Sequence, residues 1–465
     1  MSAVGLGESA TERTWPVWLE LPFGWHLRRP SREGYGLAAI VLMGFGCARS
    51  SGEYSPASLL VVVVGACLLM LTATGSGRPA ATATWGAAVF LGALSTGLLF
   101  HSSTPIGWLA PILGGVGAVV AIVFSGTLVR VCGCVIAGLM SITVLIEHTK
   151  WGQAPIDVFD FTQRGSLQLL HGQDPYFGAY LTTTLHLPLA HYPFWPGVLL
   201  LSVPGRLLGD VRVSNLLAAA AVIAALTVLA KRHGGTGLAW RCLALSLTLP
   251  FWPFMIRQAW AEIFFIAAVA LWLVLRDQHR AASVAVLGVG VATVATGLPL
   301  LVLPLLWFRR ARIEILAALA LALLIFVPFA VWVGPAHFVS YTVLTQLHLP
   351  PRADGLDLDS VWLSETGAWL PIWVWPAGSL LVLVLLAVTR PRNWSNAFYR
   401  GTAFLVVALL LAKWAFFNYY FLVTMGVIAA IALDDFRKLV PPVADASALP
   451  RVSYEAAVPI AGVAP

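Results

Sequence analysis

Two aspartates, Asp157 and Asp160, stand three residues apart where polarity rises between two long apolar parts of the chain. If this stretch is a surface helix, both carboxylates share one face, and the neighbouring phenylalanines and leucines lie toward lipid. Close carboxylates at a boundary between water and lipid have shifted pKa values, so one of them could accept a proton from a hydroxyl group. The alternative is that Asp157 caps the helix and Asp160 is solvated. The spacing of the two aspartates alone does not exclude this alternative.

A turn follows these carboxylates, because residues 172–176 read Gly-Gln-Asp-Pro-Tyr, in which glycine accepts a positive φ and proline fixes the bend. His191 and Tyr192 then precede Pro193 and a short apolar helix, in whose first turn proline is tolerated. Residues of these types are common in turns and at the starts of helices, so they do not indicate a function by themselves. A binding role for Tyr176, His191 or Tyr192 depends on the resemblance described below.

Polar residues also gather at the end of a later apolar run, where Arg257 and Gln258 are followed by Glu262. Ionisable residues near a membrane that do not act as anchors are candidates for a functional site. The alternative is a structural Arg–Glu pair at the membrane boundary.

A single lysine, Lys413, separates a leucine-rich run from an aromatic segment that contains Asn418, Tyr419 and Tyr420. Snorkelling of its long side chain to the interface is one interpretation. The other is that its charge neutralises a phosphate group.

A second polar loop, over residues 335–367, contains Arg352, Asp354, Asp357 and Asp359. These residues are either part of a binding site or simply belong to a hydrated loop.

The composition tells which elements must hold these groups. Hydrophobic residues make up 59% of the 465 residues, charged residues only 11%, and the mean hydropathy is +0.84. A soluble domain carries about 25% charged residues, so a soluble enzyme, a disordered chain and a coiled-coil rod are excluded. The apolar runs are continuous rather than alternating, which excludes an outer-membrane barrel. The sequence therefore predicts an all-α, polytopic transmembrane helical bundle.

The net charge of +7 does not indicate nucleic-acid binding, because the Lys and Arg residues stand singly or in pairs at the ends of apolar runs. Placing these ends in the cytoplasm gives about fourteen spans with both termini inside. Two conditions apply: 194–208 must not cross, and 281–307 must cross twice with a break near 295–299. The polar loops 148–193 and 335–367 then lie outside. The expected spans are 35–49, 56–75, 83–100, 105–127, 131–147, 212–230, 237–255, 259–275, 281–307 (twice), 313–334, 368–389, 397–412 and 418–434.

Several kinds of chemistry have no motif in the chain. It contains no P-loop, no G-x-G-x-x-G, no H-E-x-x-H and no G-x-S-x-G. The five cysteines lie in apolar runs without the spacing of a metal site or of a disulfide framework. We expect no cleavable signal peptide, because the basic cluster at 28–32 precedes the first apolar run.

The order of these features resembles the glycosyltransferase C superfamily of integral membrane enzymes. The resemblance covers about 131–434 and rests on an acidic residue in a loop outside the membrane, a G-x-x-P-Y turn at 172–176 and Tyr192-Pro193 before a short helix. Further similarities are 204–212, 260–262 and 413–420. The resemblance implies a catalytic membrane core at 129–434 with juxtamembrane helices outside. The other predicted parts are a cytoplasmic segment 1–33, a four-helix membrane region 34–128 and a cytoplasmic tail 435–465.

The resemblance also implies an activity, the transfer of mannose or arabinose from a polyprenyl-phosphate donor to a cell-envelope glycan or glycolipid. Asp157 would be the general base of an inverting displacement and Asp160 its acidic partner. Arg257, Lys413 and Arg352 would neutralise the phosphate. No cofactor is required, although two carboxylates could hold a divalent cation. The expected substrate-binding residues are Tyr176, His191, Tyr192, Arg257, Gln258, Glu262, Arg352, Asp354, Lys413, Asn418, Tyr419 and Tyr420.

The expected location is the bacterial plasma membrane, with the active site on the extracytoplasmic side and no nucleic acid as partner. Two other classes of protein stay open at this point. One is a secondary transporter or lipid flippase, although such proteins usually carry internal repeats with charged sites near the midplane. The other is a structural or accessory membrane protein without chemistry.

Overall fold

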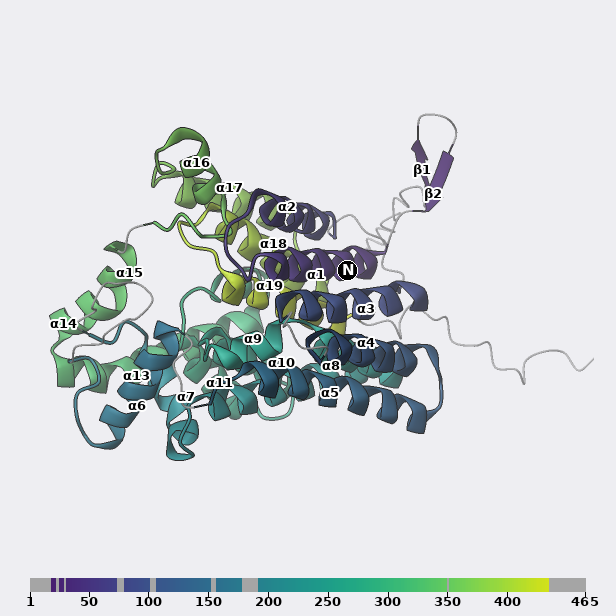
Figure 1. Ribbon diagram of the computed structural model, residues 1–465. Coiled ribbons are helices and arrows are strands. Elements are labelled where there is room, and N and C mark those ends of the chain that lie inside the picture. The colour runs from purple at the N-terminus through teal and green to yellow at the C-terminus, as the bar shows by residue number, and fades with distance from the viewer. Residues whose placement is uncertain are drawn as a thin grey trace, which may run out of the picture.

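The computed structural model describes residues 18–21, 25–28, 31–72, 79–100, 106–151, 156–177, 191–348 and 351–434. Most of the predicted segment 1–33 and the whole predicted tail 435–465 lie outside these ranges. A short antiparallel hairpin precedes the helices, with β1 (Trp18–Leu21) paired to β2 (Trp25–Arg28). All other regular structure in the described ranges is helical (Figure 1). The expected all-helical architecture is therefore confirmed for the body of the protein.

Five helices form the N-terminal part, and their bounds follow the apolar runs closely. They are α1 (Arg32–Arg49), α2 (Pro56–Leu71), α3 (Thr82–Leu99), α4 (Ile106–Val123) and α5 (Thr127–His148). α1 contacts α19 (Phe417–Ala432), α2 contacts α18 (Trp394–Leu411), and α3 to α5 contact α8 (Arg212–Thr248). The first four helices thus pack directly on the later ones, and a domain boundary at residue 128 stays a prediction.

The middle of the chain alternates short and long helices. They are α6 (Asp157–Leu170), α7 (Pro196–Leu207), α8 (Arg212–Thr248), α9 (Phe251–Arg257), α10 (Glu262–Leu275), α11 (Arg280–Val291) and α12 (Pro299–Trp307). The predicted spans 212–230 and 237–255 meet within α8, where Gly235 has a φ of +81° and turns the chain. Glycine is the residue that adopts this conformation without strain.

The C-terminal part contains the remaining helices. They are α13 (Arg309–Val333), α14 (Pro335–Val339), the π-helix η1 (Ser340–Leu344), α15 (Thr345–His348), α16 (Leu358–Thr366), α17 (Val374–Ala387), α18 (Trp394–Leu411) and α19 (Phe417–Ala432). α6, α14, α15 and α16 lie at the end of the molecule opposite to the hairpin (Figure 1). α19 is buried along almost its whole length and forms the centre of the core.

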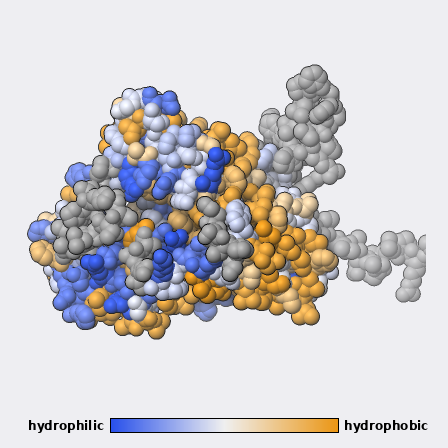
Figure 2. Space-filling view, in the orientation of Figure 1, coloured by the Kyte–Doolittle hydropathy of each residue, from blue (hydrophilic) through white to orange (hydrophobic). Residues whose placement is uncertain are grey.

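Several helices have the properties of membrane spans. In the described residues α3, α5, α8, α13 and α18 are long and apolar enough to cross a membrane, and α2, α4, α10, α11, α17 and α19 are shorter apolar helices. Figure 2 shows a broad hydrophobic surface over the part of the molecule that contains α3 to α5, and hydrophilic residues at the end that contains α6 and α16. The protein is therefore compatible with a multi-pass membrane protein, and the count of fourteen spans stays a prediction.

The expected break in the run 281–307 is confirmed. α11 ends at Val291 and α12 begins at Pro299, so two half-length helices replace one long helix. The amide of Gly197, in the first turn of α7, donates to the carbonyl of Ala292 at 3.0 Å. A Cβ on Gly197 would lie 2.5 Å from the same oxygen, so only glycine lets α7 approach the break this closely.

Candidate active site

A buried arginine at the start of α8 fixes the position of α6. Arg212 is 1% exposed, and its Nε donates to Oδ1 of Asp210 at 2.9 Å while Nη2 donates to the carbonyl of Lys150 at 3.3 Å. Its guanidinium lies 5.0 Å from the ring centre of Trp151 and 4.4 Å from that of Phe159. This one side chain therefore ties α6 and the segment after α5 to the start of α8.

The apolar side of α6 is covered by protein. Phe159 and Phe161 are both buried, and the ring of Phe161 lies 6.1 Å from that of Phe194. The side chain of Gln163 donates to the carbonyl of Gly209 at 2.8 Å. The expectation that these phenylalanines lie toward lipid is therefore wrong. Helical periodicity identifies the apolar face of a helix but not what covers it.

Asp157 is the first residue of α6 and is half-buried. Its Oδ1 accepts from the amide of Val158 at 2.8 Å, and the N-cap position belongs to Ile156, so the alternative that Asp157 caps the helix is wrong. Burial raises the pKa of Asp157, and the charge of Arg352 acts in the opposite direction. Two residues far apart in the sequence thus lie within electrostatic range of each other.

Asp160 has a different environment, although it lies one turn further along α6. Its Oδ1 accepts from Nε of Arg164 at 2.8 Å, in an i,i+4 ion pair whose arginine is 51% exposed. Such an exposed pair holds its partners only weakly. The predicted surface helix is confirmed, but a cation already engages the second carboxylate.

The second polar loop contributes an ion pair beside the site. Nε of Arg352 donates to Oδ1 of Asp354 at 2.8 Å, and the guanidinium lies 4.8 Å from the ring centre of Phe416. The carbonyl of Asp354 accepts from the amide of Tyr54 at 2.8 Å. The loop is therefore held in place by the rest of the protein rather than being merely hydrated.

Asp357 is a structural residue whose importance the sequence analysis did not single out. It caps α16, where its Oδ1 accepts from the amide of Ser360 at 2.9 Å, and its Oδ2 accepts from the amide of Ala415 at 2.9 Å. Burial raises the pKa of Asp357 to about 6. An aspartate before a short helix is an N-cap signal that could have predicted the first contact. No sequence signal indicates the second contact.

Lys413 lies in the same junction between α18 and α19. Its Nζ donates to the carbonyl of Leu347 at 2.8 Å and lies 5.5 Å from the ring centre of Trp414. Burial lowers the pKa of Lys413, and the charge of Asp359 opposes this effect. The lysine thus contacts protein groups, and its charge lies close to the second polar loop.

The predicted pair of Arg257 with Glu262 does not form. Oε1 of Glu262 instead accepts from Nδ2 of Asn418 at 2.7 Å, and Arg257 has no ion pair among the described residues. Arg257 is half-buried, and burial and the charge of Arg212 lower its pKa. Within the described residues, Oε2 of Glu262 and Oε1 of Gln258 are buried without a hydrogen bond. An additional hydrogen-bond donor could satisfy these two acceptor atoms.

The two tyrosines of α19 differ in their accessibility. Tyr420 is completely buried, and its hydroxyl donates to the carbonyl of Leu356 at 2.6 Å. Tyr419 is only partly buried and lies within electrostatic range of Glu262 and Arg352. Tyr420 thus anchors the second polar loop, whereas Tyr419 lies between the groups around Glu262 and Arg352.

The three predicted binding residues around the first turn belong to a separate cluster. Tyr176 and Tyr192 are completely buried, with ring centres 5.5 Å apart, and the hydroxyl of Tyr176 donates to the carbonyl of Phe194 at 3.0 Å. His191 stacks on Tyr341 at 4.3 Å, and burial lowers its pKa. The two tyrosines hold the connection between α6 and α7 and offer no exposed surface.

The contacts and electrostatic effects therefore join some of the predicted residues and leave others apart. Asp157, Arg352, Asp354, Tyr419, Glu262 and Asn418 form one connected set. Asp160 is engaged by Arg164, and Tyr176, His191 and Tyr192 pack elsewhere. No group of three or more His, Cys, Asp or Glu in the described ranges is placed to hold a metal ion.

This arrangement has a definite chemical capacity. A half-buried carboxylate with a raised pKa can accept a proton, and a guanidinium within electrostatic range of it can stabilise an anion. In comparisons of the chain with known proteins, no protein-family model, no curated protein and no solved structure matches it.

Proposed function

We propose that this protein is an integral membrane glycosyltransferase that uses a polyprenyl-phosphate-linked sugar. It transfers mannose or arabinose to a cell-envelope glycan or glycolipid at the extracytoplasmic face of the bacterial plasma membrane. The observation that supports this proposal best is that half-buried Asp157 lies within electrostatic range of Arg352. A proton acceptor and a cation within range of each other are the two kinds of group that such a transfer needs.

The reaction is a single displacement with inversion. The acceptor hydroxyl oxygen attacks the anomeric carbon, and the bond from that carbon to the phosphate oxygen breaks. Asp157 takes the proton of the hydroxyl, and polyprenyl phosphate leaves with both electrons of the broken bond. Negative charge on the phosphate grows as the bond breaks, so fixed cations act most strongly on the transition state.

The structure suggests which cations have this role. Arg257 is the strongest candidate because it is half-buried and has no ion pair among the described residues. Arg352 shares its charge with Asp354, and Lys413 already donates to the carbonyl of Leu347. We therefore assign the phosphate to Arg257 first, with Arg352 and Lys413 adding to the local positive potential.

The remaining predicted residues have supporting roles in this proposal. Asp160, held by Arg164, orients the acceptor rather than taking its proton. Tyr419 lies beside the sugar, whereas Tyr420, Tyr176 and Tyr192 position the loops around the site from buried locations.

The test is sugar transfer from a polyprenyl-phosphate donor by the purified full chain in liposomes. Asp157→Asn should lower the rate about 10²- to 10⁴-fold, the usual contribution of a general base. Glu365→Gln is the matched control, because Glu365 is an exposed carboxylate on α16. Wild-type transfer by Asp157→Asn would remove this residue from the mechanism.

One observation favours a second candidate, a secondary transporter or lipid flippase. Broken helices such as α11 and α12 line the substrate sites of many transporters. Substrate uptake into sealed vesicles without any glycosidic product would favour this candidate over the transferase.

A further inference from the structure

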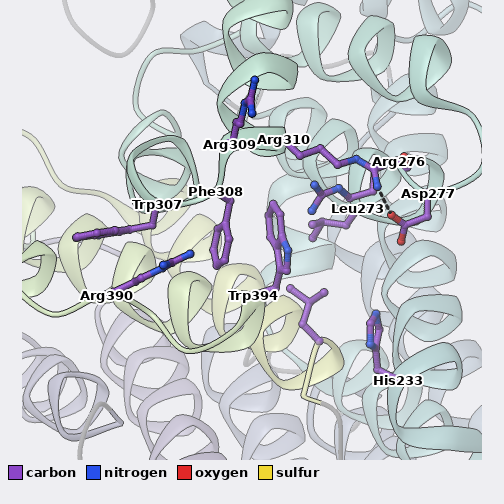
Figure 3. A pocket seen from close by; sticks show the side chains of 11 residues that line it. His233, Leu273, Arg276, Asp277, Trp307, Phe308, Arg309, Arg310, Arg390 and Trp394 are labelled. Carbon is purple, nitrogen blue, oxygen red and sulfur yellow. Dashed lines mark hydrogen bonds and ion pairs between the residues drawn. The ribbon is translucent and has the colours of Figure 1, made fainter. Parts of the chain in front are cut away.

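A pocket of about 360 Å³ lies at another place in the fold, where five connections meet (Figure 3). These connections are the turn within α8, the α10–α11 and α12–α13 junctions, the segment before α18 and the end of α19. Its lining residues include four arginines and one aspartate: Arg276, Arg309, Arg310, Arg390 and Asp277. Membrane topology explains why arginines stand at the ends of apolar runs, but it does not explain why four of them converge on one cavity.

Two of the arginines are already neutralised and form one wall of the pocket. Nε of Arg310 donates to Glu314 at 2.9 Å, and its Nη1 lies 3.2 Å from Oδ1 of Asp277. Nε of Arg276 lies 3.4 Å from Glu314, and its guanidinium lies 3.7 Å from the ring centre of Trp394. Two cations and two carboxylates balance here, so this wall adds no net charge.

The other two arginines carry the excess charge. Arg309 and Arg390 are exposed, and neither has an ion pair among the described residues. Figure 3 shows Arg390 reaching toward the aromatic wall made by Trp307 and Phe308. The indole N–H of Trp307 is buried and has no acceptor within the described part of the chain. The pocket thus combines two unpaired cations with a hydrogen-bond donor that lacks an acceptor.

The start of α13 adds to this positive potential. Its N-cap is Phe308, which provides no side-chain hydrogen bond, and its first turn contains arginines but no acidic residue. Cations at a helix N-terminus are unfavourable because the amide groups there already carry partial positive charge. A bound anion would satisfy the free amides and the arginines together.

We propose that this pocket binds a phosphate group, carried either by an anionic lipid headgroup or by a soluble phosphate compound. Planar guanidinium groups suit phosphate oxygens, and the aromatic wall suits the apolar part of such a ligand. This site is separate from the proposed active site and does not depend on the proposed reaction, because none of its lining residues belongs to the set around Asp157.

The test uses the purified full chain in a neutral detergent, with binding followed by the thermal unfolding midpoint and by native mass spectrometry. The probes are phosphatidylglycerol, phosphatidylcholine and inorganic phosphate. If the bound phosphate group belongs to a lipid, phosphatidylglycerol should bind and raise the thermal unfolding midpoint, whereas phosphatidylcholine should not. A response to inorganic phosphate alone would identify a soluble source. No response to either phosphate-bearing anion beyond that to phosphatidylcholine overturns the proposal.

The variants separate this pocket from general surface charge. Arg309→Gln with Arg390→Gln should weaken binding of the responding probe at least about tenfold, the factor that a charge-assisted hydrogen bond supplies. Arg392→Gln is the matched control, because Arg392 is exposed in the same connection but does not line the pocket. Equal loss in both variants would overturn the proposal. Unfolding midpoints that are unchanged in the absence of ligand would show that the variants fold. If the double variant does not fold, the single variant Arg390→Lys replaces it in the binding measurement.

Discussion

Arg212 offers the sharpest test of how the fold holds α6 in place. Substitution by alanine removes the guanidinium that bonds Asp210 and the carbonyl of Lys150 and that lies over Trp151 and Phe159. Asp210 would still accept from the backbone amide of residue 212, at 2.9 Å. The variant therefore removes the Arg212 guanidinium from a largely buried carboxylate.

The expected loss follows from these contacts. Removing one partner of a buried ion pair costs about 3–5 kcal/mol, because the remaining charge stays desolvated. Loss of the two cation–π contacts lowers the free energy of unfolding by a further 0.5–1 kcal/mol each, roughly, where the cost of breaking the ion pair does not already include them. The double variant Arg212→Ala with Asp210→Asn should lose less than the sum of the single losses, by about 0.5–3 kcal/mol, because no charge remains.

The assay is unfolding of the purified protein in mixed micelles by increasing amounts of sodium dodecyl sulfate, followed by tryptophan fluorescence. Arg130→Ala is the control, because the half-buried Arg130 makes a solvent-exposed hydrogen bond to the carbonyl of Phe124. That variant should change the free energy of unfolding by less than about 0.5 kcal/mol. A loss below about 1 kcal/mol for Arg212→Ala would refute the role assigned to this ion pair.

Three further outcomes are expected. Arg352→Gln removes the charge that lowers the pKa of Asp157, so the fall in transfer rate at acid pH should move to higher pH; an unmoved limb in the pH–rate profile would contradict the contact. Tyr420→Phe leaves the carbonyl of Leu356 without its donor, and the free energy of unfolding should fall by about 1–3 kcal/mol in the same micelle titration. Gly133→Ala puts a methyl group against the backbone of α4, so it should destabilise by about 1–3 kcal/mol despite the better helix propensity of alanine; a higher unfolding midpoint would disprove tight α4–α5 packing.

Hydropathy and chain punctuation predict most helices of this fold. The run 56–75 corresponds to Pro56–Leu71, and the Gly-Leu-Pro sequence at 297–299 correctly locates the break before α12. The predicted spans 212–230 and 237–255 correspond to the two helical parts of α8, which meet at the non-helical Gly235.

The candidate site could be predicted only in part. Asp157 and Arg352 were both selected as ionisable residues without an anchoring role, and their charges do act on each other. The contact of Asp357 with Ala415 could not be predicted, because it depends on how two connections cross outside the bundle. The rings of Tyr176 and Tyr192 were selected by motif, but a motif does not tell whether a ring is exposed or buried.

The hydrogen bond from Gly197 to Ala292 bears on how far this protein can rearrange. Since the two backbones touch at the break between α11 and α12, the outer helix α7 and the interrupted pair form one mechanical unit. In an alternating-access transporter, α11 and α12 would move so that the site opens first to one side of the membrane and then to the other. Such a movement would have to break the Gly197–Ala292 hydrogen bond or move α7 together with these two helices. A static scaffold that keeps its catalytic face toward one leaflet has no such requirement.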